Sequence, residues 1–160
     1  MNTTVRKAIR SDLDALVRFN RAMAEETEGK DLPSDTLRAG VLSVFDDPSK
    51  GFYIVADGDG GPVGSLLITP EWSDWRNSYY WWVQSVYVSP AYRRGGIYRT
   101  LHRYVEVLAR SNGNVAGLRL YVDSENSTAK AVYERLGMTR SRYEFFESAT
   151  LETPKRPKDD

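Results

Sequence analysis

A turn rich in arginine and glycine is the part of this sequence whose residue types most clearly predict chemistry. It follows the apolar run that ends at Val88 and Pro90, and it reads Arg93-Arg94-Gly95-Gly96. An amphipathic helical pattern starts directly after it, so a strand should pass through this turn into a helix. Glycines let a backbone approach a ligand closely, and the free amides at a helix N-terminus carry a partial positive charge. The segment therefore predicts a phosphate-binding turn.

The residues alone leave other interpretations of this turn open. It could be a flexible start of a helix whose arginines are simply solvated. The two better-known phosphate loops, GxGxxG and the Walker pattern that ends in Gly-Lys-Ser/Thr, are both absent. A nucleic-acid site would need a basic face, whereas the 22 Lys and Arg residues are balanced by 22 Asp and Glu residues. We therefore expect no nucleic-acid partner.

Length and composition predict one soluble globular domain. The chain has 160 residues, of which 41% are hydrophobic; we take residues 1–149 as a single domain and the charged segment 150–160 as a flexible tail. No apolar run approaches the ~20 residues that span a bilayer, and residues 1–11 lack a signal-peptide pattern, so we expect no membrane partner and a cytoplasmic location. Cysteine is absent and His102 is the single histidine. We expect no metal site.

The order of the expected elements is a strand, two helices, a three-strand meander, then helix, strand, helix and strand. This order predicts a mixed α/β fold with a partly antiparallel sheet. The expected strands cover 3–9, 52–56, 63–69, 79–88, 118–122 and 138–147. The expected helices begin at a cap formed by Ser11 with Asp14 and at Ser34, and cover 95–111 and 126–136, where Gly137 ends the last one. Residues 25–33 and 70–78 should be loops.

Residues 84–90, followed by residues 93–98, resemble motif A of the GCN5-related N-acetyltransferase (GNAT) family. The family's signature is Gln or Arg, two arbitrary residues, Gly, one arbitrary residue, and Gly or Ala. Arg93 occupies the first position and Gly96 the fourth. Tyr98 departs from the last position, where a small residue is usual, so its ring must turn away from the diphosphate or shape the pocket.

A second block, residues 118–122 and 126–138, is similar to the family's motif B. It combines a strand and a helix with a Tyr-Glu-x-x-Gly ending at Tyr133, Glu134 and Gly137, and Met138 replaces the usual aromatic residue. The resemblance implies the GNAT fold, a central mixed sheet flanked by helices. In that fold the strands here expected at 82–88 and 118–122 splay apart, and the acyl donor lies in the gap.

The resemblance also implies acetyl-CoA as the acyl donor and assigns residues to it. Main-chain groups of the strand at 86–88 would pair with the pantetheine arm, amides at 94–98 would hold the diphosphate, and the arginines would add charge. The residues so implied are Val86, Tyr87, Val88, Arg93, Arg94, Gly95, Gly96, Ile97, Tyr98, Asn126 and Ala129.

Direct attack of an amine on the thioester requires two proton transfers, and the resemblance assigns only one of them. Tyr133 matches the family's general acid, and a phenol of pKa ~10 can protonate a thiolate of pKa ~8.5; a core aromatic is the alternative. Gln84 stands where many members carry a glutamate, and glutamine cannot take a proton at neutral pH. Of the nearby acidic residues 25, 26 and 28, we expect Glu28 to orient a cationic acceptor.

The favoured function is therefore an N-acetyltransferase that uses acetyl-CoA and a small-molecule or peptide amine. A coenzyme A sensor without chemistry is the second hypothesis, because the residue at position 84 permits it. The identity of the acceptor and the formation of a homodimer stay open, since acceptor pockets are built from loops that vary independently of the fold.

Overall fold

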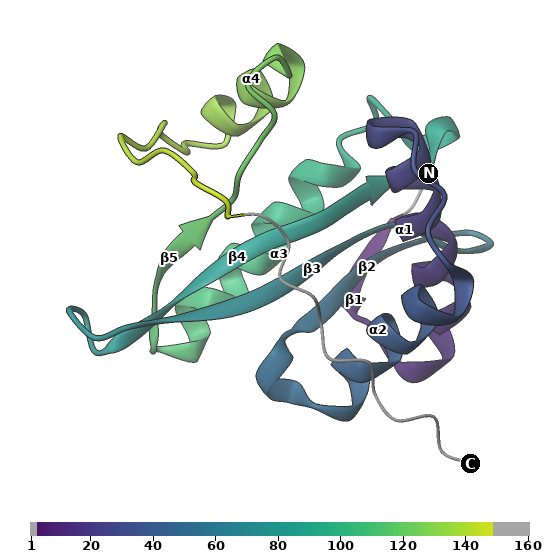
Figure 1. The fold of residues 1–160 in the computed structure, drawn as a ribbon, viewed down its shortest axis with the longest axis horizontal. Helices are drawn as coiled ribbons and strands as arrows, with labels where there is room; N and C mark the ends of the chain where they lie inside the picture. The colour runs from purple at the N-terminus through teal and green to yellow at the C-terminus, as the bar shows by residue number, and fades with distance from the viewer. Residues whose placement is uncertain (1–2, 149–160) are drawn as a thin grey trace. The chain divides into compact units, whose positions relative to one another are not determined.

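The computed structural model describes residues 3–148 of the chain (Figure 1). These residues form two compact units, Met1–Tyr121 and Val122–Asp160, which are described separately below. The predicted flexible tail at 150–160 lies outside the described residues. The prediction of one domain over 1–149 is not tested by this division.

The first unit is built on one five-stranded sheet, with the strands side by side in chain order. Neighbouring strands are antiparallel from β1 to β4, and β5 runs parallel to β4. The predicted mixed α/β fold is therefore confirmed. The strands are β1 (Thr4–Lys7), β2 (Phe52–Gly58), β3 (Gly61–Ser73), β4 (Ser78–Val88) and β5 (Val115–Arg119).

Helices cover both faces of this sheet. Helices α1 (Leu13–Glu28) and α2 (Ser34–Asp46) lie on one face, and α3 (Ile97–Asn112) crosses the other face and contacts every strand (Figure 1). Three short 3-10 turns join the elements: η1 (Arg10–Asp12), η2 (Pro48–Lys50) and η3 (Pro90–Tyr92). The sheet is therefore packed against helices on both of its faces.

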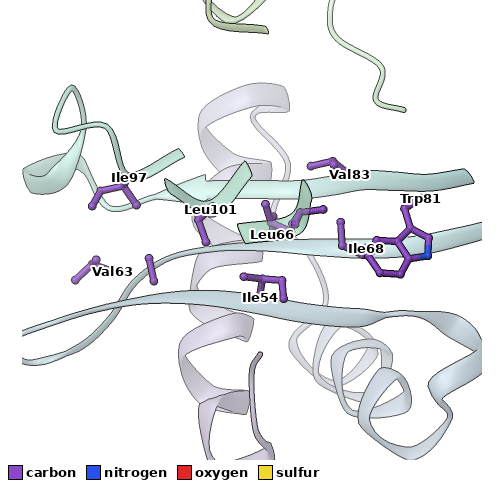
Figure 2. Packing of buried hydrophobic residues seen from close by; sticks show 10 residues of the cluster. Ile54, Val63, Leu66, Ile68, Trp81, Val83, Ile97 and Leu101 are labelled. Atoms are coloured by element: carbon purple, nitrogen blue, oxygen red, sulfur yellow. The ribbon is translucent and has the colours of Figure 1, made fainter. Parts of the chain in front are cut away.

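The alternation of side chains divides the apolar residues between two cores. Ile54, Leu66 and Ile68 point toward α3 and pack with Leu101, all of them fully buried (Figure 2). Tyr53 and Val55, which flank Ile54 on β2, pack against α1 and α2 on the opposite face. Burial of each such side chain stabilises the fold by about 1.5–3 kcal/mol.

A partly buried ion pair fixes the start of α1. The Arg6 guanidinium donates to both carboxylate oxygens of Asp12, at 2.7 and 3.0 Å, and its Nε donates to Asp57 at 2.6 Å. Asp12 also accepts the Ile9 amide at 2.8 Å. The cap predicted at Ser11 is therefore wrong: the carboxylate that satisfies the first free amide comes from the residue after it.

Several predicted boundaries are also wrong. The expected loop 70–78 is mostly strand, because β3 continues to Ser73 and pairs with β4 to its end, which leaves only 74–77 as a turn. The strand expected at 118–122 lies at Val115–Arg119. Helix α1 extends through the acidic residues to Glu28 and ends at Gly29, whose φ of 60° provides the left-handed cap.

The second unit contains one helix in its described part, α4 (Ser127–Arg135). Asn126 caps its N-terminus by accepting the Ala129 amide at 3.0 Å. Gly137, with φ of 86°, ends it as predicted. The strand predicted at 138–147 is absent from the described residues, which form neither helix nor strand there. Its alternating pattern finds no neighbouring strand with which to pair.

No helix within residues 3–148 has the length and apolar character needed to cross a membrane.

Candidate functional site

A β-bulge interrupts β4 in the middle of the sheet. Ser65 pairs with Tyr87 but Leu67 pairs with Gln84, so Leu66 faces two residues of β4 instead of one. Ser85, one of those two, has a positive φ of 49°. A non-glycine residue in this conformation costs about 1–3 kcal/mol and tends to occur at functional sites. The bulge therefore marks this part of β4 as the place to look for a site.

The bulge also exchanges the two faces of the strand. Before it, Trp81 and Val83 point into the core under α3. After it, Tyr87 points to the opposite face, where its ring stacks on Phe19 of α1 with centroids 5.1 Å apart. Val86 takes over the contact with the α3 core. Residues 85 and 87 thus face α1 and α2, which strict alternation along the strand would not allow.

The second half of β4 has a free edge. Its pairing with β5 runs from Tyr79 to Trp82 and stops at Arg119. Beyond Trp82, the segment 83–88 pairs with β3 on one side and, among the described strands, with none on the other. Such an edge can accept an extended ligand through main-chain hydrogen bonds. Val86, Tyr87 and Val88, predicted to contact the acyl donor, lie on this segment.

The predicted phosphate-binding turn lies directly after β4 and η3. Arg94 and Gly96 have positive φ angles of 64° and 80°, and Gly96 forms the N-cap of α3. Within residues 3–148, the amides of Arg94, Gly95, Gly96 and Ile97 make no well-aligned hydrogen bond to a backbone carbonyl. The expected concentration of free amides at a helix N-terminus is therefore present.

Arg93 has partners within the protein. Its Nε donates to the carbonyl oxygen of Val88 at 2.8 Å, and its Nη2 donates to Glu26 at 2.7 Å. Arg94 and Arg99 are exposed and form no ion pair with any described residue. The positive charge of the turn therefore rests mainly on Arg94 and Arg99, while Arg93 ties the turn to the end of α1.

The two residues that begin α3 pack against the sheet. Ile97 is buried in the α3 core, and Tyr98 is half-buried against it. The Tyr98 hydroxyl lies 3.5 Å from Nδ1 of His102, which is itself buried. Burial lowers the pKa of His102, with Glu106 opposing the shift. His102 therefore stays neutral at physiological pH and supports the helix.

A pocket of about 330 Å³ lies on the α1–α2 face of the sheet, beside the bulge. Asn20 and Tyr53, both buried, and the bulge residue Ser85 supply its polar groups. Desolvation raises the pKa of the Tyr53 phenol, and a hydrogen bond with Asn20 opposes this shift. The remaining lining residues are Leu32, Pro33, Thr36, Leu37, Gly40 and Val41.

Gln84, which stands where many family members have a glutamate, is held in place by a neighbour. Its Nε2 donates to Oγ1 of Thr69 on β3. Farther along the same face, Glu71 accepts from Trp82 Nε1 at 3.1 Å and from Arg119 at 2.8 Å. Both residues therefore sit in hydrogen-bonded networks across the sheet.

The acidic residues predicted near the acceptor lie in the last turn of α1, not in a loop. Glu28 forms an ion pair with Lys30 at 2.6 Å and does not line the pocket. Glu26 forms the ion pair with Arg93 described above. Glu25 is exposed.

The other predicted site residues belong to the second unit. Tyr133, on α4, is half-buried, and burial raises the pKa of its phenol above the ordinary value. Asn126 uses its carbonyl oxygen to cap α4, and the amide that it accepts belongs to Ala129.

Sequence reasoning missed the bulge, the pocket residues Asn20 and Tyr53, and the partnership of Glu26 with Arg93. The motif-A pattern predicted the strand, but nothing in it indicates the extra residue at Ser85. The pocket joins residues far apart in the chain, and only a sheet register could have placed them together.

Comparisons with known proteins agree with this geometry. A model of the acetyltransferase (GNAT) family matches residues 14–138. A mycothiol acetyltransferase from Actinosynnema mirum is 32% identical over 130 residues, which are 81% of this chain and 41% of that protein. The chain thus spans about two fifths of the length of that relative.

Solved structures extend the likeness over nearly the whole chain. A possible acetyltransferase from Clostridium difficile 630 is 41% identical with a TM-score of 0.88, covering 95% of this chain and 100% of its own. AAC(6')-Iy, solved with the bisubstrate analogue CoA-S-monomethyl-acetylneamine, is 16% identical with a TM-score of 0.74, covering 94% and 100%. At that identity the second likeness concerns the fold alone.

Proposed function

This chain belongs to the acetyltransferase (GNAT) family, and we propose that it moves the acetyl group of acetyl-CoA to a primary amine. The observation that carries the proposal is the turn at 93–97, where four amides without aligned backbone partners meet at the start of α3. It lies at the end of a strand whose second half has a free edge.

The residues of the first unit fit an acyl donor of this kind. The amides from Arg94 to Tyr98 would hold the diphosphate at the positive end of α3. The main-chain groups of Val86 and Val88, with Tyr87 between them, would pair with the pantetheine arm on the free edge. A Cβ added at Gly96 would come 3.2 Å from the end of the Arg99 side chain, so glycine keeps this approach open.

Acetyl-CoA supplies the thioester, whose C–S bond breaks as the acceptor's N–C bond forms. The attacking amine loses one proton to solvent water, and the departing sulfur takes one. In our proposal Tyr133 supplies the second proton, since its raised pKa keeps the phenol protonated at neutral pH. Asn126 and Ala129 would complete the donor contacts, and Glu28, which pairs with Lys30 outside the pocket, would attract an ammonium group only during its approach.

A coenzyme A sensor is the second candidate function, and Gln84 favours it. A glutamine that is hydrogen-bonded to Thr69 cannot act as the base. The two functions share binding of acetyl-CoA and differ in turnover, so a single assay separates them.

The test combines acetyl-CoA binding with thiol release in the presence of a panel of primary amines. Tyr133→Phe should lower kcat by about 100-fold or more and leave the Kd for acetyl-CoA unchanged, because a general acid contributes about 10²–10⁴-fold. Tyr143→Phe, which changes an exposed tyrosine of the same unit, is the matched control and should keep full activity.

Binding without thiol release would favour the sensor. Absence of binding would contradict both functions. Full activity of the Tyr133 variant would remove that residue from the mechanism and leave acetyl transfer intact.

A further inference from the structure

The pocket beside the bulge contains no charged side chain. Its nine lining residues are apolar, glycine or neutral polar residues, and Tyr53 is the only titratable one. On the surrounding helices, Arg38 pairs with Asp14 at 2.6 Å and Arg21 donates to Ser34 at 2.5 Å, and neither Asp31 nor Asp35, which flank lining residues in the chain, lines the pocket itself. A ligand in the pocket therefore meets only neutral groups.

This lining disfavours a polycationic acceptor. A charged group that enters this lining loses part of its hydration, and no carboxylate lines the pocket to offset that cost. The volume of about 330 Å³ is at the lower end of the range of roughly 300–1,000 Å³ that is typical of small-molecule sites. Leu32, Leu37 and Val41 would instead cover a small apolar body.

The same neutrality limits how the amine loses its proton. Gln84 cannot act as a base, and no lining residue is a carboxylate. The acceptor must therefore bring a substantial neutral fraction with it. An α-amino group has a pKa of about 7.7–8.0 and a lysine-type amine about 10.4, so near pH 7.5 the first offers roughly 200-fold more of the neutral form.

We propose that this pocket selects a weakly basic primary amine of the α-amino type, carried on a small, uncharged and mainly apolar body. The assignment rests on the proposed acetyl transfer and specifies its acceptor. Ser85 lines the pocket and precedes Val86 on the free edge of β4, so the pocket opens beside the strand that would hold the acyl donor. Hydroxyl groups of Ser85 and Tyr53 can accept hydrogen bonds from the entering amine.

A matched pair of acceptors tests the amine class. Leucinamide and 3-methylbutylamine share a branched apolar body but differ in basicity. Leucinamide should show about 100-fold higher kcat/KM near pH 7.5, and the ratio should shrink as the pH rises and the alkylamine becomes neutral. A leucyl tripeptide amide distinguishes a peptide N-terminus from a free small molecule, and turnover of either supports the proposal.

Equal or better turnover of 3-methylbutylamine or spermidine near pH 7.5 would overturn the acceptor class while leaving acetyl transfer intact. Absence of acetyl-CoA binding and of turnover with every amine would overturn the proposed function as well.

Variants on α2 test the pocket itself. A Cβ at Gly40 meets no atom within 4 Å, so Gly40→Leu should fill the pocket without disturbing the helix. It should raise the KM for leucinamide about tenfold, because the new side chain takes up space that the acceptor would occupy. Ala39→Leu, an exposed change on the same helix, should leave this KM unchanged.

Two further readouts separate a pocket effect from a structural one. Thr36→Asp, compared with Thr36→Asn, should improve turnover of spermidine, because it adds the missing carboxylate. Leucinamide alone should shift the NMR amide resonances of Gly40 and Ser85 in the wild-type chain. An unchanged KM in the Gly40 variant together with unshifted resonances would show that the acceptor binds elsewhere.

Discussion

We expect the Gly96→Glu variant to be more stable than the Gly96→Gln variant but to bind acetyl-CoA more weakly. Both side chains impose the same strain, because an L-residue in the left-handed conformation of Gly96, with φ of 80°, costs roughly 1–2 kcal/mol. Both meet the same neighbour, the mobile end of Arg99 at 3.2 Å from the new Cβ. The two variants therefore differ only in one negative charge at the N-cap of α3.

That charge should stabilise the folded protein. A carboxylate at a helix N-terminus contributes about 0.3–1 kcal/mol, so Gly96→Glu should unfold at a Tm roughly 1–4 °C above that of Gly96→Gln. Affinity for acetyl-CoA should change the other way. Two like charges about 4 Å apart repel by about 1 kcal/mol in water and about 4 kcal/mol at an effective dielectric constant of 20, which weakens binding by at least about fivefold.

Thermal unfolding and calorimetric titration with acetyl-CoA measure the two effects on the same samples. The difference in affinity should diminish at high salt, where the charges are screened. If the glutamate variant binds acetyl-CoA as tightly as the glutamine variant at low salt, the free amides at this turn do not receive a diphosphate.

Three further predictions concern ion pairs of the first unit. Glu26→Gln should tighten acetyl-CoA binding by about two- to fivefold at low salt, because it leaves the Arg93 charge uncompensated beside the turn; an unchanged Kd would show that Arg93 is purely structural. Glu28→Gln should raise the KM of a cationic acceptor, and unchanged kcat and KM would exclude Glu28 from acceptor binding. Asp12→Asn should destabilise the fold by about 2 kcal/mol near neutral pH, since it removes hydrogen bonds to a charged partner. The Arg6 hydrogen bond lowers the pKa of Asp12 below its ordinary value in the folded state, so this contribution is complete above about pH 5 and is lost as the pH falls through the lowered pKa. Urea denaturation of both proteins at pH 7 and at successively lower pH measures it, and a difference that does not shrink as the pH falls would contradict the linkage.

The elements that local chemistry dictates could be predicted from the sequence. The connection between the strands expected at 52–56 and 63–69, the helix end at Gly137 and the glycine turn before α3 each depend on a few neighbouring residues. All three lie where they were expected. Alternation along a strand also accounts for two neighbouring residues of β4: Trp81 enters the core, and Trp82 donates a hydrogen bond to Glu71 on the other face.

What could not be predicted depends on pairing between distant segments. The sequence of 70–78 is typical of a loop. Only the pairing of β3 with β4 shows that most of it belongs to strands. The pattern at 138–147 resembles a strand, but a strand needs a partner for its backbone groups. The bulge at Ser85 appears only when the spacing of β4 is compared with that of β3. For the same reason, the pocket that this bulge helps to line has no signature in the linear order of residues.

Because the faces of β4 are exchanged at Ser85, neighbouring residues of this strand contact two different helix layers, α1–α2 on one face of the sheet and α3 on the other. On the α1–α2 side of β4, Ser85 lines the pocket, whereas Val86 and Ile97, the first residue of α3, pack in the core on the α3 side. Substitutions in α2 can therefore reshape what enters the pocket while the groups proposed to hold the acyl donor keep their support. In the proposed function, substitutions on α2 would thus change the choice of acceptor without altering the groups that bind the acyl donor.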